Sequence, residues 1–263
     1  MKAIEKLRKS QERLNTSLCV GIDPDFNKTP SIFPKSAKGI EEFSLKIIDA
    51  TKDFASAYKI NFAFFEYFGS KGLEALENIF NNIPDNIFTI ADAKRSDIGN
   101  SSQFYAKAIF NHFNFDSVTV NPLMGKDSLV SFFEFTDKMI FLLGITSNSG
   151  ADDFLKLYFN DKHLFEIIIE KSQLWFEQDN LGFVVGATQI NEFKTARQLA
   201  PNNYFLIPGI GSQGGDFNKL KEYKLNPSII NVSRDILFAS SQIDFAEKAN
   251  KKAQEYFNLF SLF

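Results

Sequence analysis

The sequence has few of the residues that mark disulfide-rich or metal-binding proteins. Its only cysteine, Cys19, excludes an internal disulfide framework and favours a reducing compartment. Its two histidines, His112 and His163, fall in predicted helices, and the sequence has no closely spaced His or Cys ligands. We therefore expect no protein-bound metal.

Long apolar runs and a strong charge imbalance are also missing. No run approaches the ~20 residues of a membrane span, and charges interrupt the N-terminal residues too often for a signal peptide. These features predict a cytoplasmic protein with no membrane partner. Lys and Arg number 29 against 32 Asp and Glu, a balance that argues against a protein that coats nucleic acid.

Eight short apolar segments alternate with helical patterns along the 263 residues. As predicted strands they end near positions 23, 61, 92, 121, 146, 187, 209 and 233. Continuous apolar strands that alternate with helices indicate an α/β fold with a parallel sheet covered on both faces. Eight such units favour a (β/α)8 TIM barrel over a doubly wound sheet. We predict a single domain over residues 1–263, with residues 1–16 forming an N-terminal helix that packs on the barrel.

The predicted strands have apolar bodies, but the positions where they end are polar or rich in glycine. Active sites of such barrels lie at the carboxyl ends of the strands. In chain order these ends carry Asp23, Lys59 with Asn61, Asp92 with Lys94, Asn121, Thr146 with Ser147, Thr188, the Pro208–Gly211 loop and Arg234. Their convergence predicts one active site at this end of the barrel.

The most charged of these strand ends is the run from Asp92 to Asp97. Asp92 and Lys94 are two residues apart, so an extended strand would point both to the same side. Asp97 lies beyond the strand and must reach a shared site from the following loop. An alternative is that Asp97 or Ser96 only caps the next helix. The position of the run favours a site, in which flanking carboxylates keep Lys94 protonated as an electrostatic stabiliser and acid.

A glycine-rich segment follows the seventh predicted strand and indicates an anion site. Pro208–Gly215 presents backbone N–H groups with little side-chain obstruction, and Arg234 lies at the end of the next strand. Loops after strands seven and eight often bind phosphate in these barrels, and Arg can form a bidentate pair with phosphate oxygens. The alternative is a mobile turn and a surface Arg. Their coincidence at neighbouring strands favours phosphate.

Taken together, residues 92–101, 208–215 and 233–234 resemble the orotidine 5′-phosphate decarboxylase family, in its second type. The resemblance extends from Leu18 to about Arg234. Two positions depart from the family pattern. Ser96 stands where the second type usually has Gly. Ser101 stands where the family usually has Thr, and the Ser101 hydroxyl could still serve in place of the Thr hydroxyl.

The resemblance implies a role for each residue of the charged run. Lys94 matches the lysine that donates a proton to C6 of the pyrimidine after carbon dioxide leaves, and Asp92 matches the aspartate near the substrate carboxylate. Asp97 matches the aspartate that a homodimer contributes to the neighbouring active site, with Ser101 beside it. Lys59 completes an alternating Lys-Asp-Lys-Asp network.

The resemblance also implies the contacts that bind the substrate. Asp23, together with Lys59, is expected to contact the ribose, and Ser147 the pyrimidine edge. Gln213 is expected to bridge the pyrimidine and the phosphate, and Arg234 to bind the phosphate. The remaining predicted binding positions belong to the glycine-rich loop: Pro208, Gly209 and Gly214.

The reaction implied is conversion of orotidine 5′-phosphate to UMP and carbon dioxide, without metal or cofactor. A preorganised ammonium at C6 would stabilise the developing charge and then supply the proton. Two alternatives stay open. One is a Mg²⁺-dependent sugar-phosphate lyase, which shares the D-x-K-x-x-D element, and the other is a non-catalytic nucleotide-binding barrel.

Overall fold

Eight parallel strands close a barrel in a computed structural model that describes residues 1–176, 178–211, 214–223 and 225–262. Around the barrel the order is β1-β10-β9-β8-β5-β4-β3-β2. Their bounds are β1 Leu18–Ile22, β2 Ala57–Asn61, β3 Phe88–Arg95, β4 Ser117–Val120, β5 Met139–Ile145, β8 Leu181–Val185, β9 Tyr204–Pro208 and β10 Ser228–Val232. The predicted (β/α)8 fold is confirmed, and each predicted strand is present and ends within three residues of its expected position.

Helices follow the strands, as predicted. The longer ones are α1 Ala3–Leu14, α2 Ala37–Thr51, α4 Ser70–Asn81, α5 Gly99–Lys107, α8 Leu164–Trp175, α9 Ile190–Leu199 and α12 Phe245–Leu259. The shorter ones are α3 Ala63–Glu66, α6 Val130–Phe133, α7 Ala151–Phe154, α10 Phe217–Lys221 and α11 Arg234–Leu237. A π-helix, η1 Ala108–His112, continues α5, and three 3₁₀ turns are η2 Pro122–Met124, η3 Lys126–Ser128 and η4 Gln178–Asn180.

The backbone groups into two compact units. One unit comprises Met1–Ile4 and Lys94–Asn231, and the other comprises Glu5–Ala93 and Val232–Phe263. We refer to them as the central unit and the terminal unit, respectively. The expectation of one domain over residues 1–263 stays a prediction.

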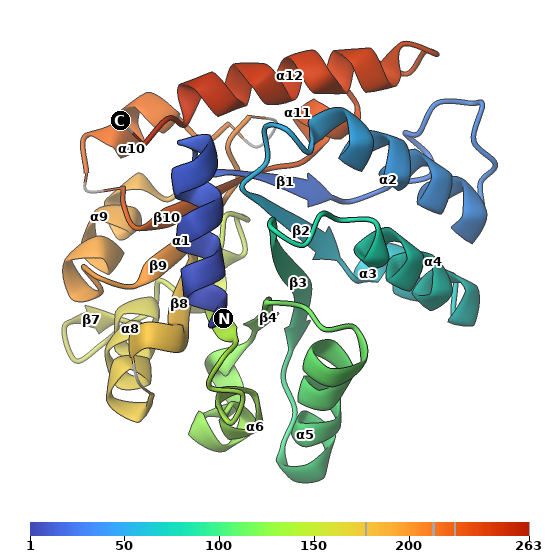
Figure 1. Ribbon diagram of the computed structural model, residues 1–263. Helices are drawn as coiled ribbons and strands as arrows, with labels where there is room; N and C mark the ends of the chain where they lie inside the picture. The colour runs from blue at the N-terminus through green and yellow to red at the C-terminus, as the bar shows by residue number, and fades with distance from the viewer. Residues whose placement is uncertain (177, 212–213, 224, 263) are drawn as a thin grey trace. The chain divides into compact units, whose positions relative to one another are not determined.

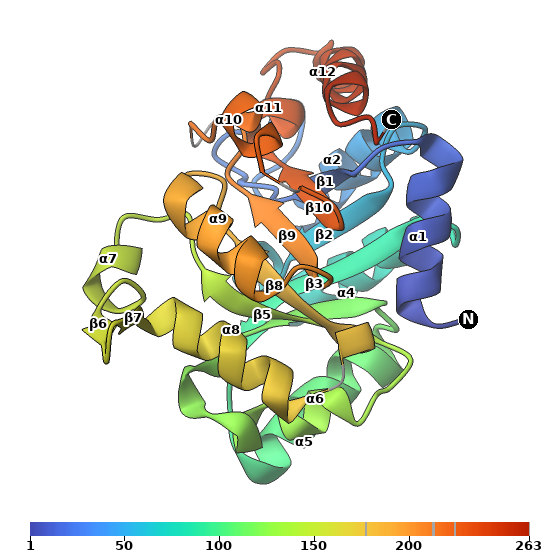
Figure 2. The same cartoon turned by 90° about the vertical axis from the view of Figure 1, so that its left-hand side faces the viewer.

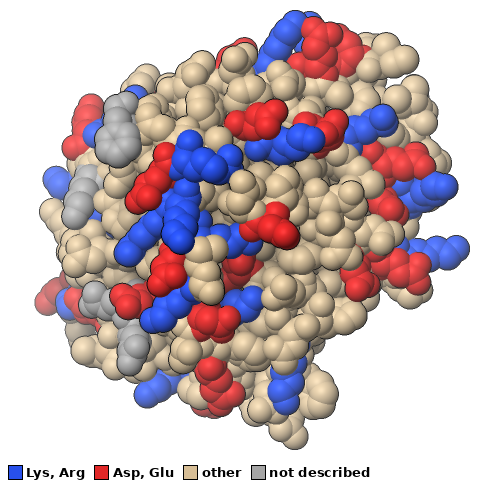
Figure 3. Space-filling view, in the orientation of Figure 1, with Lys and Arg blue, Asp and Glu red and all other residues tan. Residues whose placement is uncertain are grey.

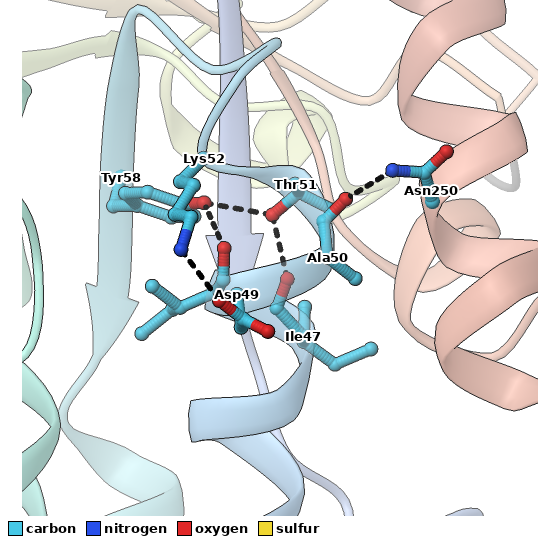
Figure 4. Close-up of polar contacts among 8 residues, drawn as sticks. Ile47, Asp49, Ala50, Thr51, Lys52, Tyr58 and Asn250 are labelled. Atoms are coloured by element: carbon cyan, nitrogen blue, oxygen red, sulfur yellow. Dashed lines mark hydrogen bonds and ion pairs between the residues drawn. The ribbon is translucent and has the colours of Figure 1, made fainter.

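In the terminal unit, α2 lies beside α4 and α12 (Figure 1). Tyr58 on β2 is fully buried, and its hydroxyl lies 2.7 Å from the Thr51 hydroxyl on α2 while donating to the Ile48 carbonyl at 3.1 Å. Asn250 on α12 donates to the Ala50 carbonyl at 2.8 Å (Figure 4). These buried polar groups are paired. The bonds therefore join α2 to β2 on one side and to α12 on the other.

The central unit is built around β4, β5, β8, β9 and β10, with α8 and α9 side by side over the sheet (Figure 2). The hairpin of β6 Tyr158–Phe159 and β7 Lys162–His163 stands at the beginning of α8 and was not predicted. The core of the central unit is rich in phenylalanine, including Phe183, Phe193 and Phe205, which are fully buried. Burial of one such side chain contributes about 1.5–3 kcal/mol. These phenylalanines thus fill the core of the central unit.

Candidate functional site

Three predicted site residues meet in the terminal unit, at the carboxyl ends of β1, β2 and β3. Lys59 on β2 is only 5% exposed, and its ammonium donates to Asp92 Oδ2 at 2.7 Å. The same nitrogen lies 3.6 Å from Asp23 Oδ1. The strand register explains this arrangement, because parallel pairing of β2 with β1 and β3 places the three strand ends next to one another.

The two carboxylates decide the charge state of Lys59. Burial alone would lower the pKa of the Lys59 amine, but the charges of Asp23 and Asp92 outweigh it and raise that pKa above its ordinary value. Lys59 is therefore an ammonium at physiological pH. It is held in a position that a flexible surface lysine would not keep, which suits a group that must meet a substrate in one orientation.

Lys94 belongs to the central unit and occupies an unusual backbone conformation. Its φ is +47°, in the left-handed region, where a residue other than glycine costs about 1–3 kcal/mol. Its N–H donates to the buried Thr119 hydroxyl on β4 at 3.0 Å, and the Arg95 carbonyl next to it accepts from Asn121 N–H at 2.9 Å. These bonds to β4 hold the strained end of β3 in place.

This conformation corrects one step of the sequence reasoning. The prediction that Asp92 and Lys94 point to the same side assumed an extended strand. Both residues do lie within β3, but the left-handed turn at Lys94 interrupts the pleat, so strand alternation does not set the direction of its side chain. Asp92 is buried, whereas Lys94 is exposed.

Asp97 lies in the loop between β3 and α5, as predicted. Its Oδ1 accepts a hydrogen bond from Ile98 N–H at 2.8 Å. The N-cap position of α5 is occupied by Ile98, so the alternative in which Asp97 or Ser96 caps this helix is wrong. Ser101 is exposed on the first turn of α5, close to Asp97 in sequence.

The predicted pyrimidine contact, Ser147, follows β5 and is held against the end of β8. Thr188 Oγ1 donates to the Ser147 carbonyl at 2.9 Å, and Gln189 Nε2 donates to the Thr146 carbonyl at 3.3 Å. Gly186 makes this approach possible, because a Cβ there would lie 2.7 Å from the Ser147 Cα. The sequence indicated polar residues at both strand ends, but not that one end supports the other.

The glycine-rich segment after β9 folds back on itself. Gly215 N–H donates to the Gly209 carbonyl at 3.0 Å, and Gly214 N–H donates to the Gly211 carbonyl at 2.8 Å. Gly209 has a φ of +100°, which favours glycine. Two of the amides expected to bind an anion are thus used within the loop. The Pro208 carbonyl accepts from Ala187 N–H at 2.8 Å, and Gln213 lies outside the described residues.

Arg234 is the first residue of α11 in the terminal unit, directly after β10, and its side chain is exposed. The short helix is anchored by Ile236 and Leu237, which are 0% and 1% exposed. The predicted phosphate-binding arginine is therefore exposed to solvent, while the helix that carries it is fixed by two buried side chains.

Comparisons with known proteins agree on one family. The model of the orotidine 5′-phosphate decarboxylase / HUMPS family matches residues 16–254. The chain belongs to this family. It is 47% identical over 242 residues to an orotidine 5′-phosphate decarboxylase of Flavobacterium johnsoniae, covering 90% of the chain and 89% of the relative. An orotidine 5′-phosphate decarboxylase of Dehalococcoides mccartyi is 45% identical over 263 residues, covering 97% and 96%.

A solved structure of the same kind supports the fold. The structure of Leishmania donovani OMP decarboxylase superposes with a TM-score of 0.84 at 33% identity and covers 98% of this chain and 99% of that one. The resemblance to the orotidine 5′-phosphate decarboxylase family is thus confirmed. Assignment to its second type, and the roles of the individual residues, stay predictions.

Among the described residues, no group of three or more His, Cys, Asp and Glu could hold a metal ion. His163 is the N-cap residue of α8 rather than a residue within that helix. No helix in the described parts of the chain is long and apolar enough to cross a membrane. Figure 3 shows Lys and Arg interspersed with Asp and Glu on the face drawn.

Proposed function

We propose that this chain decarboxylates orotidine 5′-phosphate to UMP and carbon dioxide in the cytoplasm, as a step of pyrimidine biosynthesis. One observation carries the proposal. A buried ammonium, Lys59, lies between Asp23 and Asp92 at three adjoining strand ends of a family member, and Lys94 follows two residues after Asp92. Relatives that are 45–47% identical carry the name of this enzyme.

Lys94 is the proposed acid. Loss of carbon dioxide leaves negative charge at C6, and an ammonium at that carbon would stabilise the charge and then protonate it. The backbone at Lys94 is fixed by its bond to Thr119, so little reorganisation would be needed during the reaction. Asp92 would stand near the substrate carboxylate, held by Lys59.

The same ion pairs favour this reaction over that of a Mg²⁺-dependent sugar-phosphate lyase. A magnesium site needs carboxylates that are open to the cation. Here the Lys59 ammonium already lies 2.7 Å from Asp92 and 3.6 Å from Asp23. The donor set therefore favours chemistry without a metal or another cofactor.

The other substrate contacts follow from the family resemblance. Asp23 and Lys59 would bind the ribose, and Ser147 the pyrimidine edge. The phosphate would be bound by Arg234 and Gln213, together with the loop positions Pro208, Gly209 and Gly214. Phosphate binding, remote from C6, would then support catalysis through the closing of the site.

We further propose a homodimer in which Asp97 reaches the active site of the partner. Large apolar side chains are exposed in the part of the central unit that follows Asp97 in sequence, on or next to α5, η2 and α6, where α5 packs against α6. They are Ile98, Phe104, Tyr105, Leu123, Met124 and Val130, between 39% and 68% exposed. Large exposed apolar side chains, where they gather on one face, mark protein interfaces. A second copy of the chain is the partner that would bring Asp97 to a neighbouring site.

The proposal is tested by a spectrophotometric assay of orotidine 5′-phosphate, with and without a chelator. We expect turnover in both conditions, and a loss of at least about 10³-fold for Lys94→Ala with the fold intact. Lys171→Ala, at an exposed lysine on α8, is the matched control and should retain full activity. Activity that requires added Mg²⁺ would favour the lyase, and binding of UMP without turnover would favour the non-catalytic barrel.

A further inference from the structure

The residue that follows Arg234 takes part in a hydrogen bond between two helices. Asp235, the second residue of α11, accepts a bond of 2.8 Å from the Tyr256 hydroxyl on α12. The helices α11 and α12 pack against each other, and both contact β1. The ring of Tyr256 packs on Phe260, with 5.4 Å between ring centroids. This pair therefore ties the turn that carries Arg234 to the last long helix.

Asp235 poses an electrostatic problem for a phosphate site. Its carboxylate is adjacent in sequence to the Arg234 guanidinium, and it is half-buried. If its side chain were free to turn, it could pair with Arg234 and would repel a phosphate dianion nearby. The hydrogen bond from Tyr256 holds Oδ2 of Asp235 on the side of α12 instead.

The tyrosine is suited to be a permanent donor. Burial, and after it the hydrogen bond and charge of Asp235, raise the pKa of the Tyr256 phenol well above its ordinary value. The phenol consequently keeps its proton over the whole physiological range, so the bond to Asp235 does not depend on pH there.

We infer that Tyr256 is a positioning residue for phosphate binding: by holding the Asp235 carboxylate, it leaves Arg234 free for the phosphate of the substrate. The inference rests on the proposed function, since it takes orotidine 5′-phosphate as the ligand of Arg234. It assigns to α12, which lies outside the charged run and the glycine-rich loop, a role in substrate binding.

The test compares substrates with and without the phosphate. Tyr256→Phe removes the hydroxyl but keeps the ring on Phe260. We expect KM for orotidine 5′-phosphate to rise about tenfold, because the released Asp235 carboxylate would compete with the phosphate for Arg234, with kcat changed less than about twofold. Activity on orotidine, which lacks the phosphate, should not change. Tyr158→Phe, at an exposed tyrosine on β6, is the matched control and should leave both activities unchanged.

A second variant separates positioning from simple loss of structure. Asp235→Asn removes the negative charge with little change in size, so the double variant Tyr256→Phe with Asp235→Asn should recover most of the lost affinity for orotidine 5′-phosphate. An unchanged KM in Tyr256→Phe would overturn the inference. So would a raised KM that Asp235→Asn does not correct, or an equal loss on orotidine, since either would indicate a structural role.

Two reference measurements separate this inference from the proposed function. If the unmodified chain does not decarboxylate orotidine 5′-phosphate, the proposed function fails. If Arg234→Ala leaves KM for this substrate unchanged, the phosphate assignment fails. When both behave as expected and Tyr256→Phe still has no effect, only the positioning role of Tyr256 is wrong.

Discussion

The molecule buries two cations in opposite ways. Lys59 in the terminal unit and Arg197 in the central unit are 5% and 4% exposed. Lys59 lies between two carboxylates, which raise the pKa of its amine. Among the described residues, Arg197 has no carboxylate partner, and burial lowers the pKa of its guanidinium to about 10. One cation is compensated by charge, whereas the other is compensated by neutral acceptors.

The partners of Arg197 are backbone carbonyls at the end of α9 and before β10. Its two terminal nitrogens donate to the carbonyls of Ala200, Asn203, Leu225 and Pro227, at 2.9 to 3.2 Å. Its guanidinium also lies over the Phe205 ring, 3.6 Å from the centroid. Arg197 thus joins three segments of the chain, at the end of α9, before β9 and before β10. This is the pattern of a structural residue.

The difference separates a buried charge that is structural from one that serves the proposed reaction. Neutral carbonyls suffice to keep an arginine in place, so an ion network is not needed for burial alone. Buried ion pairs contribute little net stability, because desolvation opposes the attraction. The carboxylates around Lys59 are better explained by the proposed chemistry at three strand ends, where fixed charges are required.

The largest expected effect is on turnover, from Lys59→Met. This change removes the ammonium that holds Asp92 and Asp23, and we expect turnover of orotidine 5′-phosphate to fall at least about 10³-fold. Breaking a buried ion pair also costs about 3–5 kcal/mol of unfolding free energy, which circular dichroism in urea would measure. Arg197→Met is the contrasting variant. Turnover near the normal value in Lys59→Met would contradict the difference drawn between the two cations.

The second effect is on stability alone, from Arg197→Met. We expect the free energy of unfolding to fall by about 3 kcal/mol, because two buried and two part-buried carbonyls lose a donor. Turnover per folded molecule should stay normal. Arg197→Lys should be intermediate, since an ammonium cannot reach all four acceptors. Urea unfolding and an assay on the same samples would check this, and a large loss of turnover in folded Arg197→Met would show that this cation also serves the site.

Sequence patterns gave the barrel because the strands are apolar runs with polar ends. The convergence of Asp23, Lys59 and Asp92 followed from that topology, since strand ends in a parallel barrel share one edge. Pairings that depend on packing could not be predicted. Nothing in the local sequence indicates that Arg197 is buried, because its partners are backbone carbonyls up to 30 residues away.

The other structural features that the sequence did not predict have a similar physical origin. The left-handed backbone of Lys94 is imposed by β4, through Thr119, and a strand pattern cannot reveal it. The short helices α3, α7 and α11 and the β6–β7 hairpin are too brief to show a hydrophobic period. The contact of Tyr256 with Asp235 joins two helices that the sequence leaves unrelated.

The smallest effect is on the pH dependence of stability at alkaline pH. There the contributions of Lys59 and Arg197 to the free energy of unfolding should change in opposite directions. The folded pKa of Lys59 is raised above the value of about 10.4 for an unfolded lysine. Its contribution to stability is therefore complete below pH ~10.4 and declines above it, because the unfolded chain loses this proton first. The folded pKa of Arg197 is about 10, lower than in the unfolded chain. The unfolded chain then binds more protons above that pH, so the contribution of Arg197 becomes more favourable as the pH rises.

Urea unfolding between about pH 9 and pH 11 would measure both slopes in the unmodified chain, Lys59→Met and Arg197→Met. Subtracting each variant from the unmodified chain cancels the titration of all other groups. The difference for Lys59→Met should decrease with pH and the difference for Arg197→Met should increase, each by less than about 1.4 kcal/mol per pH unit. Slopes of the same sign would mean that the two cations are compensated in the same way, and the division between a charge-paired site residue and a carbonyl-bound structural residue would not hold.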